Sequence, residues 1–444
     1  MKRIQLTFWA LLAACSALWL LADTFVPSTV NFFSLRGVFI QYTGVIGIGA
    51  MSAAVWLAAR PKWLEPRLDG LDKMYRLHKW LGIAGLVLAI THWLWAQGAK
   101  WMVGWGWLVR PAREQRAQGE VVGPIEQFFR SQRDLAESLG EWAFYAAVVL
   151  IALALIKRFP YRQFVKLHKW LAVVYLVLVF HSVVLMKFSY WTQPIGVVMA
   201  LLMAGGTVAA LMSLSGRIGA GRQTRGTIES LTYYPELRVL ETAIELQEGW
   251  RGHEAGQFAF VTSNRREGAH PYTIASAWTG DRRIVFITKA LGDHTSSLQQ
   301  RLKTGDAVTV EGPYGCFNFI DPRPRQIWVG CGIGITPFVA RLKTLANAPG
   351  HQVIDLFHTT ADYEQAAIDK LKADARAANV RLHLLVSRTD GRLNAARIRA
   401  AVPEWPSASI WFCGPGTFGQ ALRRDFVAAG LAPEDFHQEL FEMR

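Results

Sequence analysis

Six long apolar runs in the first half of the chain restrict its fold more than any other feature. They lie at about 4–22, 36–59, 77–98, 139–157, 164–187 and 194–215 of 444 residues. Each is close to the roughly 20 residues that a helix needs to cross a bilayer. The first run lacks a small-residue cleavage site, so we count it as a span rather than a signal peptide. The sequence therefore predicts a bundle of six transmembrane helices.

Positive charge in the loops predicts how this bundle is oriented. Loops 60–76 and 157–166 carry five and four Lys or Arg residues, whereas 23–35 and 188–193 carry none. Because short cytoplasmic loops are rich in Lys and Arg, both termini are expected in the cytoplasm, in a bacterial-type inner membrane. The long loop 99–138 fits less well, but long loops carry little weight. The net charge of +14 comes without a basic stripe interleaved with aromatics, so nucleic acid is not an expected partner.

Four histidines stand inside two of the apolar runs, and they are the only histidines before residue 253. His78 and His92 lie in the third run, and His168 and His181 in the fifth. Both runs cross the membrane in the same direction, so the histidines form two pairs at matching depths, about 20 Å apart. Ionisable side chains in a span are costly and point to function. The pairs predict axial ligands for the irons of two b-type haems.

Two other interpretations of these histidines compete with haem ligation. They could be buried side chains bonded to backbone carbonyls, or a proton relay in a channel or transporter with a nucleotide-sensing domain. The matched depths favour haem. However, a separation of 13 residues places His168 and His181 roughly 140° apart around a regular helix, so the two side chains do not share a face. Nearby cations at the inner surface have two open roles, as partners of haem propionates or as topology anchors: Arg76, Lys79, Lys166 and Lys169.

The second half of the chain has the character of soluble α/β sequence. Residues 222–320 alternate apolar and polar positions with glycine-rich turns, which predicts an antiparallel β-barrel. From 321 to 444, apolar strands at 326–330, 353–358, 380–386 and 409–413 alternate with helical stretches, which predicts a parallel α/β domain. We therefore expect three domains, at 1–217, 222–320 and 321–444.

A glycine-rich turn follows the first strand of the predicted parallel sheet. It reads GCGIGITP at 330–337 and opens a helix. Glycines let the backbone approach a pyrophosphate, and the helix N-terminus supplies amide donors. Many such turns are only tight turns, but here Cys413-Gly414-Pro415 ends a later strand at the same edge. Together the two segments predict a dinucleotide site.

The chain also resembles the ferric reductases and NADPH oxidases, most closely the compact bacterial NADPH oxidases. HPYTIAS at 270–276, GDHT at 292–295 and EGPYG at 311–315 are similar to their flavin-binding segments. GIGITP at 332–337 and CGP at 413–415 are similar to their nicotinamide-binding segments, and the tail 436–444 to their C-terminal tail. The histidine spacings match their bis-haem pattern. No EF-hand loop or activator-docking segment is evident, so no obligatory protein activator is expected.

The resemblance implies cofactors and site residues. The implied FAD-binding residues are His270, Pro271, Tyr272, Thr273, Thr288, Gly292, His294 and Thr295. The implied NAD(P)-binding residues are Gly332, Gly334, Thr336, Pro337, Arg388, Gly414 and Pro415. Phe441 is expected to stack on the flavin and Cys413 to lie near hydride transfer, although either could be plain packing. Arg388 favours NADPH, with NADH left open, because a guanidinium suits a 2′-phosphate.

These expectations combine into one electron path. NADPH reduces FAD in the cytoplasm, and electrons pass through the His78/His168 and His92/His181 haems to an external acceptor. Oxygen, giving superoxide, is the expected acceptor, and a ferric chelate is the alternative. A haem subunit that feeds a quinone or a partner protein is a third possibility.

Overall fold

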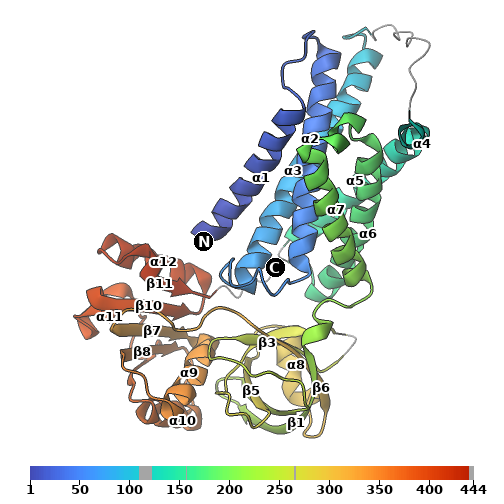
Figure 1. Ribbon diagram of the computed structural model, residues 1–444. Coiled ribbons are helices and arrows are strands. Elements are labelled where there is room, and N and C mark those ends of the chain that lie inside the picture. The colour runs from blue at the N-terminus through green and yellow to red at the C-terminus, as the bar shows by residue number, and fades with distance from the viewer. Residues whose placement is uncertain (110–122, 157, 265–266, 440–444) are drawn as a thin grey trace. The chain divides into compact units, whose positions relative to one another are not determined.

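The computed structural model describes residues 1–109, 123–156, 158–264 and 267–439, which fall into two compact units (Figure 1). Residues 1–68 and 73–218 form the first unit, and residues 69–72 together with those from 219 onward form the second. The boundary at 218/219 agrees with the change in composition. The expected division at 320/321 within the second unit stays a prediction.

The first unit is helical. Its helices are α1 (Lys2–Ala22), α2 (Phe32–Ala58), α3 (Leu71–Gly104), α4 (Pro124–Ser131), α5 (Arg133–Leu155), α6 (Tyr161–Leu185) and α7 (Pro194–Leu214). All except α4 are long and apolar enough to cross a membrane, as predicted. Large apolar side chains such as Leu6, Trp9 and Leu201 are 66–72% exposed on the surface of this unit, which suits a lipid environment.

Small residues let the helices of the first unit pack closely. Tyr175 of α6 is fully buried, and its hydroxyl shares a 2.8 Å hydrogen bond with Ser52 of α2. A Cβ at Gly206 of α7 would overlap the same hydroxyl. The three helices α2, α6 and α7 therefore meet around one phenol, which holds them in register because a buried hydroxyl needs a partner.

The second unit begins with a six-stranded antiparallel sheet. Its strands are β1 (Gln223–Tyr234), β2 (Val239–Leu246), β3 (Phe258–Thr262), β4 (His270–Thr273), β5 (Arg283–Lys289) and β6 (Ala307–Tyr314), in the order β4-β3-β6-β1-β2-β5. The two edge strands meet again at an isolated bridge between Ile274 and Phe286. The helix α8 (Asp293–Arg301) follows β5. Apolar side chains from alternate positions fill the interior, as the period-two pattern indicates.

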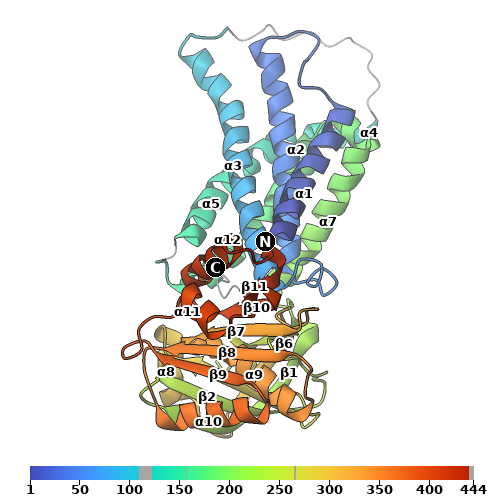
Figure 2. The same ribbon diagram turned by 90° about the vertical axis from the view of Figure 1, so that its left-hand side faces the viewer.

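A five-stranded parallel sheet completes the second unit (Figure 2). Its strands are β7 (Arg325–Cys331), β8 (Val353–Thr360), β9 (Arg381–Val386), β10 (Ala408–Cys413) and β11 (Phe436–Gln438), in the order β11-β10-β7-β8-β9. Helices α9 (Thr336–Asn347) and α10 (Gln365–Ala377) pack on one face. Helices α11 (Ala395–Ala401) and α12 (Gly416–Ala428) pack on the other. Both faces are covered, as a parallel sheet requires.

Candidate functional site

The four membrane histidines form two facing pairs between α3 and α6. The ring centres of His78 and His168 lie 5.8 Å apart, with planes at 68°. Those of His92 and His181 lie 6.2 Å apart, with planes at 78°. Metal–imidazole bonds of about 2 Å on opposite sides of one ion would place ring centres about 6 Å apart. Each pair therefore has the separation of two axial ligands.

Backbone carbonyls orient three of these rings. Nδ1 of His78 donates to Ala54 O at 2.8 Å, and Nδ1 of His92 donates to Ile40 O at 3.0 Å, both on α2. Nδ1 of His181 donates to the α5 carbonyl of Ala136 at 2.7 Å. Because these bonds use Nδ1, Nε2 is the nitrogen available to a metal, and a bonded Nδ1–H fixes the tautomer that ligation needs. Carbonyl bonding and ligation are therefore compatible at these rings.

His168 differs from the other three. Its Nδ1 is buried and has no hydrogen-bond partner among the described residues, and its ring packs against Phe164. The helix α6 is α-helical throughout Tyr161–Leu185. No distortion of the helix therefore brings His168 and His181, which are 13 residues apart, onto the same face. His168 and His181 therefore reach their partners from different sides of a regular helix, and this difference accounts for their unlike surroundings.

A cavity of about 400 Å³ extends around the His92/His181 pair. Glycines bring its walls close: a Cβ at Gly140 would overlap the His181 ring, and one at Gly44 would touch His92. Polar side chains also line the cavity, and they include Arg36, Lys100, Arg133, Glu137 and Glu141. Sequence reasoning placed cations only at the inner pair. Arg36, whose guanidinium donates to the carbonyls of Trp95 and Ala96, could not be found from loop charge because it lies inside a span.

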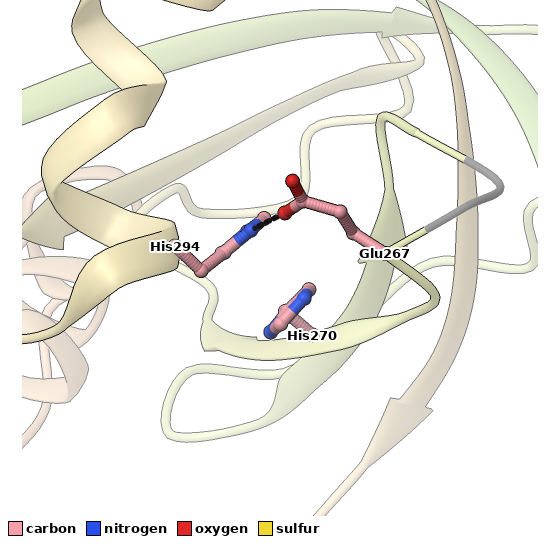
Figure 3. A group of neighbouring side chains, drawn as sticks. All are labelled: Glu267, His270 and His294. Carbon is pink, nitrogen blue, oxygen red and sulfur yellow. Dashed lines mark hydrogen bonds and ion pairs between the residues drawn. The ribbon is translucent and has the colours of Figure 1, made fainter. Parts of the chain in front are cut away.

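The expected flavin residues His270, Tyr272 and His294 lie together at the junction of β4 and α8. The rings of His270 and His294 are stacked 3.5 Å apart, at 8°. The Tyr272 hydroxyl bonds His294 Nε2 at 2.8 Å, and His294 Nδ1 bonds the Glu267 carboxylate (Figure 3). Glu267 also accepts from Arg301 at 2.5 Å. The result is a chain of bonds from a phenol through an imidazole to a carboxylate and a guanidinium.

The surroundings act differently on His270, which stacks against this chain, and on Glu267, which belongs to it. Burial, and then the neighbouring His294, lower the pKa of His270 to about 4. The hydrogen bond from His294 holds the pKa of Glu267 below its usual range. Glu267, His270 and His294 could offer three ligand atoms to a cation. However, both nitrogens of His294 already bond Glu267 and Tyr272, so the cluster is organised as a hydrogen-bonded chain.

The remaining expected flavin residues lie in β4, in β5 and at the start of α8. Pro271 and Thr273 stand in β4 opposite Phe260 and Phe258, and Thr273 is buried. The hydroxyl of Thr288, in β5, donates to Leu240 O at 3.2 Å. Thr295 Oγ1 accepts from the amides of Leu291 and Gly292 and thereby caps α8. The amide-rich start of α8 is thus set beside His270, where a phosphate would be stabilised.

The structure brings the two expected nucleotide segments into contact. Gly332 has φ +56°, a left-handed conformation that favours glycine. A Cβ at Gly334 would overlap the Cys413 carbonyl, and one at Gly414 would meet the Cys331 side chain. The glycine turn and the end of β10 therefore form one surface at the carboxyl edge of the sheet, where ligands of such folds bind.

The other nucleotide residues surround that surface. Thr336 is buried at the start of α9 and its hydroxyl donates to Ile333 O at 2.7 Å, while Pro337 follows in the first turn. Pro415 caps α12. Cys413 is fully buried, and burial raises the pKa of its thiol well above the usual value, so it stays protonated. Phe441 lies outside the described residues.

Arg388 follows β9 and is largely exposed, but it is held at one point. Its Nη2 donates to Asp362 Oδ1 at 3.1 Å. Sequence reasoning found Arg388 but missed Asp362, Glu267 and Arg301. These three are ordinary surface charges by sequence pattern. The fold places Asp362 beside Arg388, 26 positions away, Glu267 beside His294, 27 positions away, and Arg301 beside Glu267, 34 positions away.

Two separate segments of the chain match known protein families. Residues 43–179 match the model of the ferric reductase like transmembrane component, and residues 227–318 match that of an FAD-binding domain. An NADPH oxidoreductase of Mycobacterium tuberculosis is 30% identical over 248 residues, which cover 52% of this chain and 63% of that protein. The carnitine monooxygenase reductase subunit of Escherichia coli is 31% identical over 147 residues, which cover 32% and 43%. The chain thus spans less than two thirds of either relative.

Among solved structures, flavohaemoglobin from Malassezia yamatoensis has a TM-score of 0.47 at 16% identity, covering 92% of this chain and 97% of that one. That score is too low to carry an argument about the fold. The two matched domains and the mycobacterial relative are informative because they agree with the histidine pairs and the flavin segments. Over the matched segments the chain is therefore similar to the ferric reductase like transmembrane component, to an FAD-binding domain and to an NADPH oxidoreductase.

Proposed function

We propose that this chain is an oxidoreductase that passes electrons from cytoplasmic NAD(P)H to an acceptor on the opposite side of the membrane. The two histidine pairs carry the proposal, because ring centres 5.8 and 6.2 Å apart suit one axially ligated metal in each pair. A proton relay would not require facing rings at this separation. In the proposed arrangement, residues 1–217 hold the haems, 222–320 bind FAD, and 321–444 bind the nucleotide.

Two b-type haems are the proposed occupants of the pairs, His78 with His168 and His92 with His181. A haem iron carries single electrons, and its potential depends on its axial ligands and their hydrogen bonds. The carbonyls of Ala54, Ile40 and Ala136 would keep Nε2 of three rings aimed at iron. Glycines at positions 44 and 140 let α2 and α5 approach the outer imidazoles closely, which would hold those rings in place beside the group.

FAD is the proposed occupant of the region between β4 and the start of α8. Flavin chemistry converts a two-electron hydride donor into single-electron steps. The residues of this chain would orient the ring through Tyr272, receive phosphates at Gly292 to Thr295, and place the nucleotide against the turn 332–337. Phe441 would cover the flavin, and the neutral thiol of Cys413 would contribute shape rather than nucleophilic chemistry.

Oxygen is the proposed acceptor and superoxide the proposed product. His92 and His181 would hold the group nearest the acceptor, and with two imidazoles committed at each site that group would supply electron transfer rather than a place to bind oxygen. A ferric chelate could receive an electron at the same place. The orientation, with both termini in the cytoplasm of a bacterial-type cell, belongs to this proposal as well.

A visible difference spectrum tests the proposal directly. Reduced-minus-oxidised spectra of the purified protein in detergent should show b-type haem bands. Replacement of His92 and His181 by Ala should remove about half of the absorbance per protein, because the inner pair stays intact. A colourless protein, or a Soret band unchanged in this double variant, would contradict the proposal and favour a channel.

The acceptor is tested by NADPH consumption in detergent with a superoxide-sensitive probe, with and without superoxide dismutase. We expect a probe signal that dismutase abolishes. Consumption that requires ferric citrate would identify the ferric reductase alternative. Consumption that requires a quinone would identify a haem subunit serving another partner.

A further inference from the structure

Three charged side chains meet at the carboxyl edge of the parallel sheet. Asp362 follows β8, Arg388 follows β9, and Lys289 ends β5 of the antiparallel sheet. The Asp362 carboxylate accepts from Arg388 Nη2 at 3.1 Å and lies 3.5 Å from Lys289 Nζ. The Arg388 side chain is 76% exposed, whereas those of Asp362 and Lys289 are 25% and 14% exposed. We name these three residues the edge triad.

The edge triad lies on the side of the sheet where the dinucleotide is expected. The glycine turn 332–337 follows β7, β8 is its neighbour, and β9 is next. In such sheets the pyrophosphate lies at the helix that follows the glycine turn. An acidic residue farther along bonds the ribose 2′-hydroxyl of NAD, whereas an arginine there receives the 2′-phosphate of NADP. This chain has both kinds of residue, and they are bonded to each other.

The loops that carry Asp362 and Arg388 are tied together. Ser387 donates to the Thr360 carbonyl from its amide at 2.8 Å and from its hydroxyl at 2.9 Å. The Thr360 hydroxyl donates in turn to Asp362 O at 2.9 Å. These bonds fix the two loops, so the contact of Arg388 with Asp362 is more than a chance meeting of solvated side chains. The Ser387 hydroxyl is also committed as a donor, which leaves Arg388 as the main candidate for a phosphate.

We propose that Asp362 is the residue that determines the choice between NADH and NADPH at this site, a proposal that rests on the proposed function. With its carboxylate charged, the edge triad carries one net positive charge. With a neutral residue in place of Asp362, Lys289 and Arg388 would carry two positive charges, which equal the two negative charges of a 2′-phosphate dianion. Asp362 also repels the phosphate and accepts a hydrogen bond from a 2′-hydroxyl. Discrimination of this kind uses a repulsive group as well as an attractive one.

Nucleotide binding to the full-length protein in detergent tests this assignment without turnover. The probes are 2′,5′-ADP, which carries the 2′-phosphate, and 5′-AMP, which carries the hydroxyl, both measured by calorimetry. Asp362→Asn should raise the affinity for 2′,5′-ADP about tenfold and change that for 5′-AMP little, because the amide still accepts a hydrogen bond. The gain should shrink with added salt, since the pair is partly exposed to solvent.

Two further variants make the result specific. Arg388→Ala should weaken 2′,5′-ADP binding and abolish the effect of Asp362→Asn when the two are combined, since the residues act on one phosphate. Asp369→Asn is the matched control: it makes the same change of charge on exposed α10, where Asp369 bonds Gln365 rather than Arg388. The ratio of the affinities for 2′,5′-ADP and 5′-AMP should be the same in Asp369→Asn as in the parent protein.

The outcomes separate the two proposals. An unchanged ratio of affinities in Asp362→Asn, with both probes still binding, would overturn the role of Asp362 and leave the proposed function standing. Failure of both probes to bind the parent protein would overturn the nucleotide site itself. Because the ratio is taken within each variant, partial loss of folded protein does not alter it.

Discussion

Both ring nitrogens of His253 are committed in the second unit. Trp250 Nε1 donates to His253 Nδ1 at 3.3 Å, and His253 Nε2 donates to Ser276 O at 3.1 Å. A proton on Nδ1 would break the first bond, and burial lowers the pKa of His253 to about 4. His253 is 8% exposed, so water offers it little compensation. Its neutral form is therefore part of the fold.

We expect His253 to make the second unit sensitive to acid. An unfolded histidine takes up its proton near pH 6.5, whereas folded His253 resists until about pH 4. The contribution of neutral His253 to the free energy of unfolding is therefore complete above pH 6.5. It is lost as the pH falls towards 4, by up to about 3 kcal/mol. Urea midpoints measured by tryptophan fluorescence between pH 7 and 4.5 should fall less steeply in His253→Asn. An equal slope in the variant and the parent would contradict this, and exposed His351→Asn is the control.

The Tyr272 hydroxyl should make a modest contribution to flavin binding. Tyr272→Phe keeps the ring but removes the 2.8 Å bond to His294. A net hydrogen bond is worth about 1 kcal/mol, so the Kd for FAD should rise roughly two- to tenfold. Tyr272→Ala also removes the aromatic surface and should cost much more. FAD titrations of flavin-stripped protein measure both changes, and equal losses in the two variants would exclude a separate role for the hydroxyl.

At the scale of elements, Gly140 allows α5 and α6 to approach each other beside the outer pair. A Cβ there would overlap the His181 ring, so Gly140→Ala should displace that ring. We expect loss of about half of the haem absorbance per protein, with the inner pair retained. Gly82→Ala in α3 is the matched control, because an added Cβ there meets nothing within 4 Å. Equal haem content in both variants would contradict the proposed position of the outer haem.

Most elements could be predicted because apolar periodicity marks them, and the exceptions lack that signal. The six spans and the strands from β7 to β10 agree with prediction to within a few residues, except that α3 begins earlier and ends later than expected and α5 begins earlier. The helix α8 buries only Leu298, so its sequence shows no apolar stripe. The strand β11 has three residues, too few for any pattern. Among the expected flavin residues, His270, Tyr272 and His294 lie together in the fold, and their role in binding FAD stays a prediction. Glu267 and Arg301 join them through side-chain bonds that no motif marks.

At the scale of the whole molecule, the proposed topology puts both termini on the cytoplasmic side of the membrane. With Cys316 and Cys331 replaced by Ser, Ser28→Cys in the exposed loop before α2 should react with an impermeant maleimide in intact cells. Ala373→Cys, on the exposed side of α10, should react only after permeabilisation. We expect this labelling pattern because short loops rich in Lys and Arg lie on the cytoplasmic side of a membrane. The reverse labelling pattern would contradict a cytoplasmic second unit.

The carbonyl acceptors on α2 repeat the spacing of the rings on α3. His78 bonds Ala54 and His92 bonds Ile40, so both steps are fourteen residues, taken in opposite directions along the chain. One residue inserted between His78 and His92 would turn the outer imidazole by about 100° away from its carbonyl. The separation between the inner and the outer histidine is thus fixed by both α3 and α2, and lengthening it with both bonds kept would need matching insertions in the two helices.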